Sequence, residues 1–290
     1  MRKISWNDKL KIGVDVVDKA HARLFKIVGK LMEQMEYEPN YQNTCKESIR
    51  FLEDYTMGHF SEEEAYMRSI GYSGYEKHKR IHDKFRDVTL VSLKKRLEES
   101  DYAPEDVEHF SAVMAGWLTG HIMTEDQAII GNIVAKRVYE DSLDTHIIAS
   151  AFNQAMKDVF HLEAELVSGD YNGRNIRDCY YYHLCYDIKG GGNIQILLGL
   201  EEQLARRGVG MMLGLSAMQK PEMVGDASMK ILEHFLHHLG KLFMSDSEYH
   251  LYKEERLTRD EFRKDFMTRC SCHLLFETRL GHFIFCVEKW

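Results

Sequence analysis

Residues 59–67 read His59-Phe60-Ser61-Glu62-Glu63-Glu64-Ala65-Tyr66-Met67, and this stretch carries the first indication of the fold. His59 and Glu63 are four residues apart, so in an α-helix their side chains lie on the same face, about one turn apart. Apolar residues at three- and four-residue spacing extend the pattern over about 41–68, until Ser69-Ile70-Gly71 ends it. The stretch therefore predicts a long amphipathic helix that presents a histidine and a carboxylate on one face.

Three other helical segments carry residues of the same kind. The first segment contains His21, the third contains His78 and His82, again four residues apart, and the fourth contains His121 and Asp126. Because five residues separate His121 from Asp126, an α-helix would turn the carboxylate well away from the histidine. We therefore expect His121 to be a terminal ligand and Asp126 to reach across the bundle as a bridging ligand.

The apolar periodicity divides the first part of the chain into four helices, which begin near residue 19 and cover about 41–68, 75–99 and 104 to beyond Trp117. Short connections between such helices predict an antiparallel four-helix bundle. A polar segment, 135–142, follows the bundle pattern. We place the domain boundary near residue 140, which gives domains of 1–138 and 142–290.

The candidate metal ligands are His21, His59, Glu63, His78, His82, His121 and Asp126. Taken singly, a lone His21 is typical of a polar surface residue, and the His78/His82 pair is typical of a solvated helix face. Contributions from all four helices in order favour a metal site instead. Neutral imidazoles suit iron, copper or zinc, and a carboxylate can bridge two cations. For two octahedral ions with a bridging oxygen, this set leaves one coordination position open, as the binding of a small diatomic molecule requires.

Composition narrows the functional classes. The formal net charge is -8 and the sequence pI is about 6.0, so neither nucleic acid nor an anionic membrane is expected as the main partner. No apolar run approaches the roughly 20 residues that span a bilayer. The N-terminal Met1-Arg2-Lys3-Ile4-Ser5-Trp6 reaches polar residues before a signal-peptide core could form. We therefore expect a cytoplasmic protein.

The second half of the chain has a different sequence pattern. Asp144–Phe160 has a helical pattern, whereas the aromatic run Cys179–Tyr186 and the apolar run Ile194–Leu198 favour strands joined by a glycine-rich turn. Further helices are expected over about 200–213 and 222–243. Paired strands are expected at 272–276 and 282–287. The pattern predicts an α/β domain, with mixed helices and strands around one sheet.

Residues 1–138 resemble bacterial hemerythrins. The matching features are Trp6-Asn7-Asp8, Ile12-Gly13-Val14, the 59–67 stretch, Gly71-Tyr72, the His78/His82 pair and Trp117-Leu118-Thr119-Gly120-His121-Ile122-Met123-Thr124-Glu125-Asp126. The resemblance implies two non-haem iron ions with an oxo or hydroxo bridge and O2 as their reversible ligand. It also implies that His78, His82 and His121 hold one iron, that His21 and His59 hold the other, and that Glu63 and Asp126 bridge them.

The segment from Ile147 resembles CheX-type and CheC-type chemotaxis phosphatases. That family removes the phosphoryl group of a response regulator with a glutamate and an asparagine at ExxN spacing on a helix. Here Lys230 and Glu233 stand at those positions, so the phosphatase motif is not found. We therefore expect an interaction or homodimerisation module whose partner is a response regulator or another signalling protein. The cluster His234, His237 and His238 on the same helix favours a polar or interface face over a second metal site.

Two classes of function follow from the resemblance. The first is an oxygen sensor or carrier. The presence of a second domain favours sensing over carriage. The second is a di-iron enzyme that reduces nitric oxide or peroxide, which would share every ligand. A histidine-rich site stabilises high-valent iron less well than the carboxylate-rich sites of oxygen-activating bundles, and this favours reversible binding.

Overall fold

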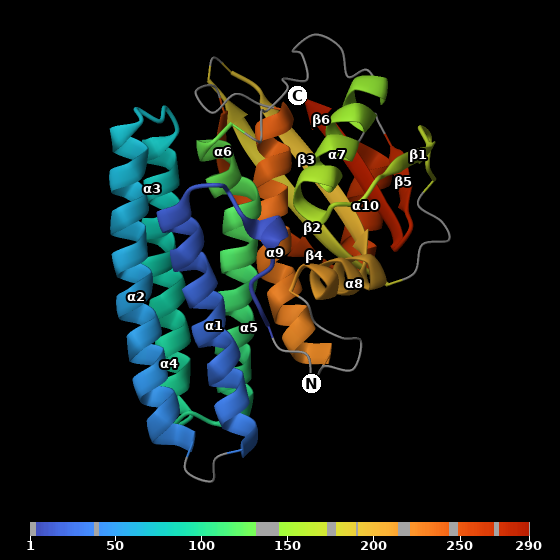
Figure 1. Ribbon diagram of the computed structural model, residues 1–290. Helices are drawn as coiled ribbons and strands as arrows, with labels where there is room; N and C mark the ends of the chain where they lie inside the picture. The colour runs from blue at the N-terminus through green and yellow to red at the C-terminus, as the bar shows by residue number, and fades with distance from the viewer. Residues whose placement is uncertain are drawn as a thin grey trace. The chain divides into compact units, whose positions relative to one another are not determined.

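The computed structural model describes residues 4–37, 41–131, 145–172, 178–189, 191–213, 221–243, 249–269 and 273–289. The chain forms two compact units (Figure 1). The first comprises Met1–Val134 with Val209–His234, and the second comprises Ala135–Gly208 with Phe235–Trp290. The boundary predicted near residue 140 falls outside the described residues, so the division into 1–138 and 142–290 remains a prediction.

The first unit is built on a bundle of long helices, as the sequence predicts. Its elements are α1 (Asp15–Tyr37), α2 (Tyr41–Ser69), α3 (Tyr75–Lys84), α4 (Val91–Glu99), α5 (Pro104–His121) and α6 (Gln127–Ile129). Two π-helical segments interrupt the last two arms of the bundle, Phe85–Leu90 between α3 and α4 and Ile122–Asp126 between α5 and α6. A π-helical turn carries one residue more than an α-helical turn, and such turns are frequent at functional sites.

Local chemistry sets the helix ends of the bundle. α2 ends at Ser69, and Gly71 just beyond it adopts φ +64°, a conformation that glycine accepts without strain. The amide of Tyr72 then donates to the carbonyl of Met67 at 2.9 Å and closes the turn into α3. α5 begins at Pro104, whose missing N–H is not needed at a first helical position. These signals fix where one arm of the bundle ends and the next begins.

An N-terminal segment precedes α1 and lies against the bundle core. Its apolar side chains Ile4 and Leu10 are each 1% exposed. The Asp18 carboxylate accepts hydrogen bonds from the backbone amides of Ile12 at 2.9 Å and Gly13 at 3.0 Å, which ties the segment to the start of α1. The segment also carries Trp6, whose ring centroid lies 6.1 Å from that of His21.

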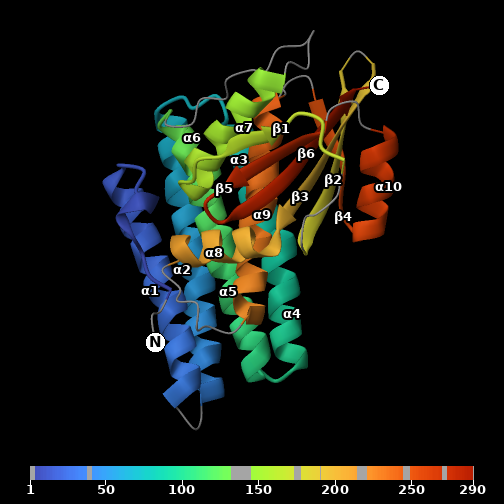
Figure 2. The same ribbon diagram turned by 90° about the vertical axis from the view of Figure 1, so that its right-hand side faces the viewer.

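The second unit contains a six-stranded antiparallel sheet, in the order β1-β5-β6-β3-β2-β4 (Figure 2). Its strands are β1 (Glu165–Ser168), β2 (Cys179–Ile188), β3 (Asn193–Glu201), β4 (Tyr249–Leu257), β5 (Leu274–Thr278) and β6 (Gly281–Lys289). The helices outside the bundle are α7 (Thr145–Phe160), α8 (Glu202–Met212), α9 (Pro221–Phe243) and α10 (Arg259–Arg269). The predicted mixture of helices and strands around one sheet is confirmed.

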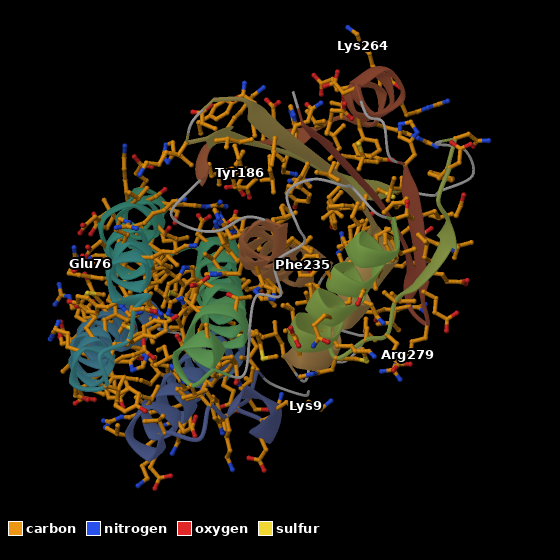
Figure 3. The ribbon with its side chains drawn as sticks, turned by 90° about the horizontal axis from the view of Figure 1, so that it is seen from above. Lys9, Glu76, Tyr186, Phe235, Lys264 and Arg279 are labelled. Atoms are coloured by element: carbon orange, nitrogen blue, oxygen red, sulfur yellow. The ribbon has the colours of Figure 1, made fainter. Side chains whose placement is uncertain are left out.

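Side chains alternate between the two faces of this sheet. One face packs Phe276 and Phe283 against Phe152 of α7, with ring centroids 4.9 and 4.2 Å apart. Phe235 of α9, labelled in Figure 3, adds an edge contact to Phe152 at 5.9 Å. The other face carries a smaller apolar cluster around Phe262 of α10, made of Tyr171, Tyr181, Leu197, Phe262, Ile284 and Cys286. Burial on both faces explains why the central strands read as nearly continuous apolar runs.

Sequence reasoning did not predict β1, β4 or α10. β1 and β4 are the two edge strands of the sheet. Charged residues in β4, whose sequence is Tyr-His-Leu-Tyr-Lys-Glu-Glu-Arg-Leu, remove the alternation that marks a buried strand. In α10 Phe262 is a buried residue within an otherwise strongly charged sequence. No helix among the described residues is long and apolar enough to cross a bilayer.

Candidate metal centre

The structure brings the seven predicted ligands together inside the bundle. His59 is 3% exposed, His78 is 1% exposed, and the other five are fully buried. They come from four helical arms: His21 from α1, His59 and Glu63 from α2, His78 and His82 from α3, His121 from α5, and Asp126 from the π-helical segment after it. Polar groups this deeply buried are costly unless they are paired or bind a metal ion.

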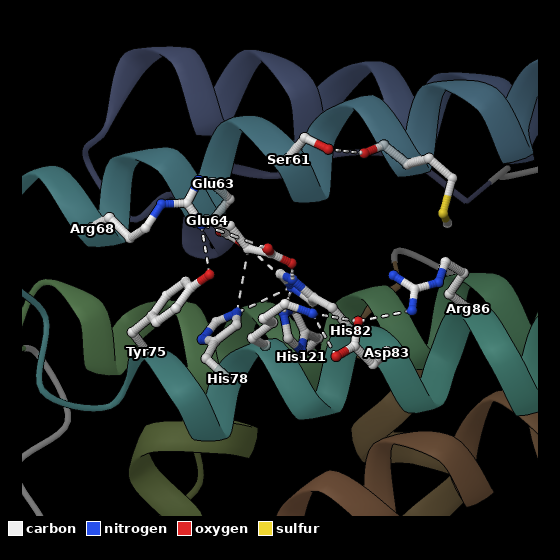
Figure 4. A network of polar contacts seen from close by, with 12 residues as sticks. Ser61, Glu63, Glu64, Arg68, Tyr75, His78, His82, Asp83, Arg86 and His121 are labelled. Atoms are coloured by element: carbon white, nitrogen blue, oxygen red, sulfur yellow. Dashed lines mark hydrogen bonds and ion pairs between the residues drawn. The ribbon is translucent and has the colours of Figure 1, made fainter.

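Glu63 lies where two groups of donor atoms meet. Its Oε2 is 3.2 Å from Nε2 of His82 and 3.4 Å from Nε2 of His78 (Figure 4). Glu63 belongs to two groups of potential metal ligands, and within each group the ligand atoms lie within 4.8 Å of one another. The first group contains His78, His82 and His121, and the second contains His21 and His59. A carboxylate in this position can bridge two cations.

Asp126 also contacts histidines of both groups, but by a route that differs from the prediction. Its Oδ1 is 3.0 Å from Nε2 of His121, and its Oδ2 is 3.3 Å from Nε2 of His21. The expectation that the five-residue spacing would turn Asp126 away from His121 was therefore wrong. The segment Ile122–Asp126 is π-helical, and this wider turn returns the fifth residue to the face of His121.

The donor atoms have the pattern of a cation site. Nε2 of His82 lies 3.2 Å from Nε2 of His78 and 3.0 Å from Nε2 of His121. Both carboxylate oxygens of Glu63 and of Asp126, and both ring nitrogens of His21 and His59, lack a hydrogen-bond partner among the described residues. Buried polar atoms are nearly always satisfied, and lone pairs that converge in this way are satisfied by a positive ion.

Burial keeps His21, His59 and His121 neutral, which is the form that binds metals. Desolvation lowers the pKa of His21 and of His121 well below 6.5, and the neighbouring histidines lower it further. Desolvation likewise lowers the pKa of His59 to about 4, although the charge of Glu63 opposes this. These imidazoles therefore offer a lone pair at neutral pH without competition from a proton.

The two carboxyl groups have opposite shifts without a cation. Burial disfavours the charge on Glu63, but the close polar contacts with the rings of His78 and His82 outweigh this and hold the pKa of Glu63 well below 4.5. Burial and the nearby charge of Glu63 raise the pKa of Asp126 well above 3.8. The protein alone therefore favours one anion here rather than two. Bound cations would reverse this preference, since they are the largest charges in such a site.

Aromatic rings hold the imidazoles on the three-histidine side. Phe60 stacks on His82 with ring centroids 3.9 Å apart and an interplanar angle of 6°. Trp117 stacks on His121 with ring centroids 4.5 Å apart and an interplanar angle of 12°, and Phe85 in turn stacks on Trp117 at 3.9 Å. Phe60 and Trp117 are part of the sequence motifs, but sequence reasoning assigned no role to these contacts. Apolar walls of this kind exclude water from a metal site.

The histidine cluster of α9 has separate environments. His234, in the first unit, lies edge-on to the ring of Trp117 at 5.7 Å and to the ring of His121 at 5.9 Å. His237 Nε2 is 3.3 Å from the carboxylate of Glu254. The groups of metal-binding geometry among the described residues all lie in the bundle. The structure thus gives His234 a packing role beside a candidate ligand, which sequence reasoning missed.

Residues 12–133 match the family described as the hemerythrin HHE cation binding domain. A bacteriohemerythrin of Clostridium acetobutylicum is 32% identical to this chain over 129 residues, which cover 43% of this chain and 97% of that protein. The chain belongs to the hemerythrin family. Other similar hemerythrins are a bacteriohemerythrin of Pseudomonas aeruginosa, 30% identical over 45% of this chain and 81% of that protein, and a myohemerythrin of Riftia pachyptila, 27% identical over 44% and 92%.

Solved structures similar to this hemerythrin include two chemotaxis proteins. CheX from Vibrio vulnificus is 12% identical, with a TM-score of 0.36, over 50% of this chain and 98% of that chain. CheX from Desulfovibrio desulfuricans is 11% identical, with a TM-score of 0.34, over 50% and 97%.

The positions that ExxN spacing singles out in this hemerythrin are occupied by an ion pair. Nζ of Lys230 lies 2.9 and 2.8 Å from the two carboxylate oxygens of Glu233, one turn further along α9. The carboxylate of Glu233 is thus paired with Lys230, and neither of the two positions carries an amide side chain.

Proposed function

We propose that this hemerythrin binds dioxygen reversibly at a non-haem di-iron centre and that its occupancy is read by the rest of the chain. The observation that carries the proposal is the convergence of seven buried donors, among which both carboxylates and the imidazoles of His21 and His59 lack a hydrogen-bond partner among the described residues. When bound, an iron pair would lend electrons to dioxygen and recover them on release. The protein's own residues would bind the iron ions, orient the imidazole ligands and shield the site from water.

We assign His78, His82 and His121 to one ion and His21 and His59 to the other. Glu63 and Asp126 would be shared by the two ions, because each carboxylate lies beside histidines of both groups. The ion held by His21 and His59 would have one histidine fewer and would be the one that takes up the diatomic ligand. Trp6 and Phe25 lie beside this end of the site, with the ring centroid of Trp6 6.1 Å from His21 and 5.9 Å from Phe25. Apolar rings here keep water away from the bound ligand.

Consecutive glutamates of α2 provide the test of the di-iron assignment. Glu63→Gln removes the shared carboxylate charge while preserving its shape, and we expect iron per chain to fall from two to one or none. Glu62→Gln makes the same change of charge at an exposed position one residue earlier and should leave two irons per chain. Iron counted after anaerobic loading and desalting measures both. One iron in the wild-type protein, or two in Glu63→Gln, would contradict the assignment.

The signalling part of the proposal concerns the second unit. We propose that it acts as an interaction or homodimerisation module toward a signalling partner such as a response regulator, because a plain oxygen carrier needs no second domain. The oligomeric state of the deoxygenated and oxygenated proteins, measured by analytical ultracentrifugation, should differ. Identical sedimentation and identical hydrogen exchange over Glu165–Lys289 in the two states would argue against coupling.

The C-terminal half of the chain is not proposed as a phosphatase, since Lys230 and Glu233 of α9 form an ion pair at the positions that ExxN spacing singles out. The full chain, added to a phosphorylated receiver domain, should leave the rate of phosphate release unchanged. A rate clearly above that of the receiver alone, and lost in Lys230→Ala, would show that these residues do carry a phosphatase.

A further inference from the structure

The five imidazoles of the candidate centre differ in whether their Nδ1 atom has a polar contact. Nδ1 of His21, His59, His78 and His121 has no hydrogen-bond partner among the described residues. Nδ1 of His82, in contrast, lies 3.2 Å from Oε1 of Glu64. Among the five histidines, His82 is thus the one for which the structure records a carboxylate at the nitrogen that points away from the donor cluster.

Glu64 occupies this position because it follows Glu63 on α2. Successive residues of an α-helix point about 100° apart, so Glu63 faces the bundle interior while Glu64 passes alongside it. The side chain of Glu63 is fully buried, and that of Glu64 is 14% exposed. Glu64 can therefore reach a buried imidazole and still have its far oxygen near the surface.

A basic and a phenolic group hold Glu64 from the outer side. Nη1 of Arg68 lies 4.0 Å from Oε2 of Glu64 and donates a hydrogen bond to the hydroxyl of Tyr75 at 2.6 Å (Figure 4). The guanidinium of Arg68 also lies over the ring of Tyr75, 5.2 Å from its centroid. Glu64 thus belongs to a chain of polar contacts that runs from His82 to the surface side of α2 and α3.

This arrangement has a defined chemical consequence for His82. A carboxylate that accepts the Nδ1 proton fixes the tautomer in which Nε2 carries the lone pair, and Nε2 is the nitrogen that faces Glu63, His78 and His121. The negative charge behind the ring also makes the imidazole a stronger electron donor. A stronger donor stabilises the more highly charged state of a bound metal ion.

We propose that Glu64 is a positioning residue that sets the tautomer and the donor strength of His82, so that it favours the oxidised state of the metal pair and biases the three-histidine ion. The proposal rests on the proposed di-iron function. Phe60, stacked on His82 at 3.9 Å, fixes the ring plane, and Glu64 fixes which nitrogen carries the proton. Arg68 lies 4.0 Å from Glu64 on the surface side and is itself hydrogen-bonded to Tyr75.

The matched variants are again neighbours on α2. Glu64→Gln keeps an acceptor oxygen and removes the charge, Glu64→Ala removes both, and Glu62→Gln is the exposed control with the same change of charge. In the iron-free protein, ¹⁵N spectra of the histidine rings should show His82 as the Nδ1–H tautomer in the wild type and in Glu62→Gln. In Glu64→Ala the Nε2–H form should appear. This measurement needs neither metal nor oxygen.

The iron-loaded proteins provide the second measurement. Glu64→Ala should bind iron(II) about ten- to one hundredfold more weakly than Glu62→Gln, the usual effect of losing such a partner. Glu64→Gln should keep two irons but oxidise more slowly in air, with a higher midpoint potential. If the proposed oxygen binding fails, the tautomer and iron affinity still decide the role of Glu64. Glu64→Gln and Glu64→Ala that match Glu62→Gln in tautomer, affinity and potential would overturn the proposal, with wild-type oxygen binding intact.

Discussion

The imidazole of His121 and the carboxylate of Asp126 face each other at 3.0 Å, although five residues separate them, because a π-helical turn connects the two. The same turn places the other carboxylate oxygen of Asp126 3.3 Å from Nε2 of His21 on α1. One extra residue in the backbone thus lets a single carboxylate contact histidines of both groups. Irregular backbone at this point serves the candidate site rather than the packing of the helix.

The first prediction concerns the cost of burying Asp126. Its carboxyl is fully buried beside the charge of Glu63, and both effects raise its pKa well above 3.8. A raised carboxyl pKa means that the folded state loses stability as the pH rises through that pKa. Asp126→Asn should therefore make the iron-free protein more stable at pH 7.5, while iron binding falls below two per chain. Calorimetry and iron analysis measure the two effects, and a less stable iron-free variant would contradict this account of the site.

The second prediction concerns Phe60, which is 4% exposed and stacks on His82 while its edge meets Phe85 at 6.0 Å. Phe60→Ala should lower the free energy of unfolding of the iron-free protein by about 3–5 kcal/mol, the usual range for a buried phenylalanine. Phe51→Ala, at a position that is 46% exposed on the same helix, should cost far less. Urea denaturation followed by circular dichroism gives both values. Equal losses would show that the contact with His82 adds nothing to packing.

A third prediction uses two helical glycines with different surroundings. A Cβ at Gly116 of α5 would lie 2.5 Å from the carbonyl oxygen of Ala227, which belongs to the same unit, so Gly116→Ala forces the backbone apart and should cost about 1–3 kcal/mol. A Cβ at Gly58 of α2 would meet no atom within 4 Å among the described residues, so Gly58→Ala should stabilise by about 0.5–1 kcal/mol through helix propensity. Thermal unfolding compares them. Stabilisation by both variants would mean that α5 and Ala227 are not in close contact.

A fourth prediction concerns the thiol of Cys179 in β2, which is not in a disulfide. Burial raises its pKa to about 12, so at pH 8 its reactive thiolate is roughly a thousandfold rarer than in the unfolded chain. Iodoacetamide should label Cys179 in the native protein far more slowly than in urea, as measured by peptide mass spectrometry. The unfolded thiol ionises near pH 9 while the folded one keeps its proton, so this group also lowers stability as the pH rises above about 9. Labelling at similar rates in the two states would contradict the assigned burial.

The bundle and the candidate ligands could be predicted because two independent periods agree in the sequence. Apolar residues recur with the helical period, and the pairs His59/Glu63 and His78/His82 recur at the spacing of one helical turn on those same helices. The position of Asp126 could not be derived, because the argument assumed α-helical geometry where the backbone is π-helical. Nothing local in Ile122–Asp126 marks this turn; contacts with other helices select it.

The second unit shows a different limit. Its central strands β2 and β3 are apolar on both faces and were predicted, whereas the edge strands β1 and β4 were not. An edge strand pairs through its backbone, and its side chains need not alternate, so a charged sequence such as that of β4 carries little signal. The partner of His82 was also missed. Glu62, Glu63 and Glu64 are chemically identical and differ only in the direction in which their side chains point. That direction depends on the rotation of α2 about its axis within the bundle.

The most direct test of the central claim is an optical spectrum of the anaerobically reduced, iron-loaded protein before and after air is admitted, with iron counted per chain. The account predicts two irons, charge-transfer bands that appear with oxygen, and their loss when oxygen is removed, over repeated cycles. One iron or none would contradict the di-iron site. Two irons with immediate and irreversible oxidation would contradict reversible binding and favour an enzyme that reduces nitric oxide or peroxide.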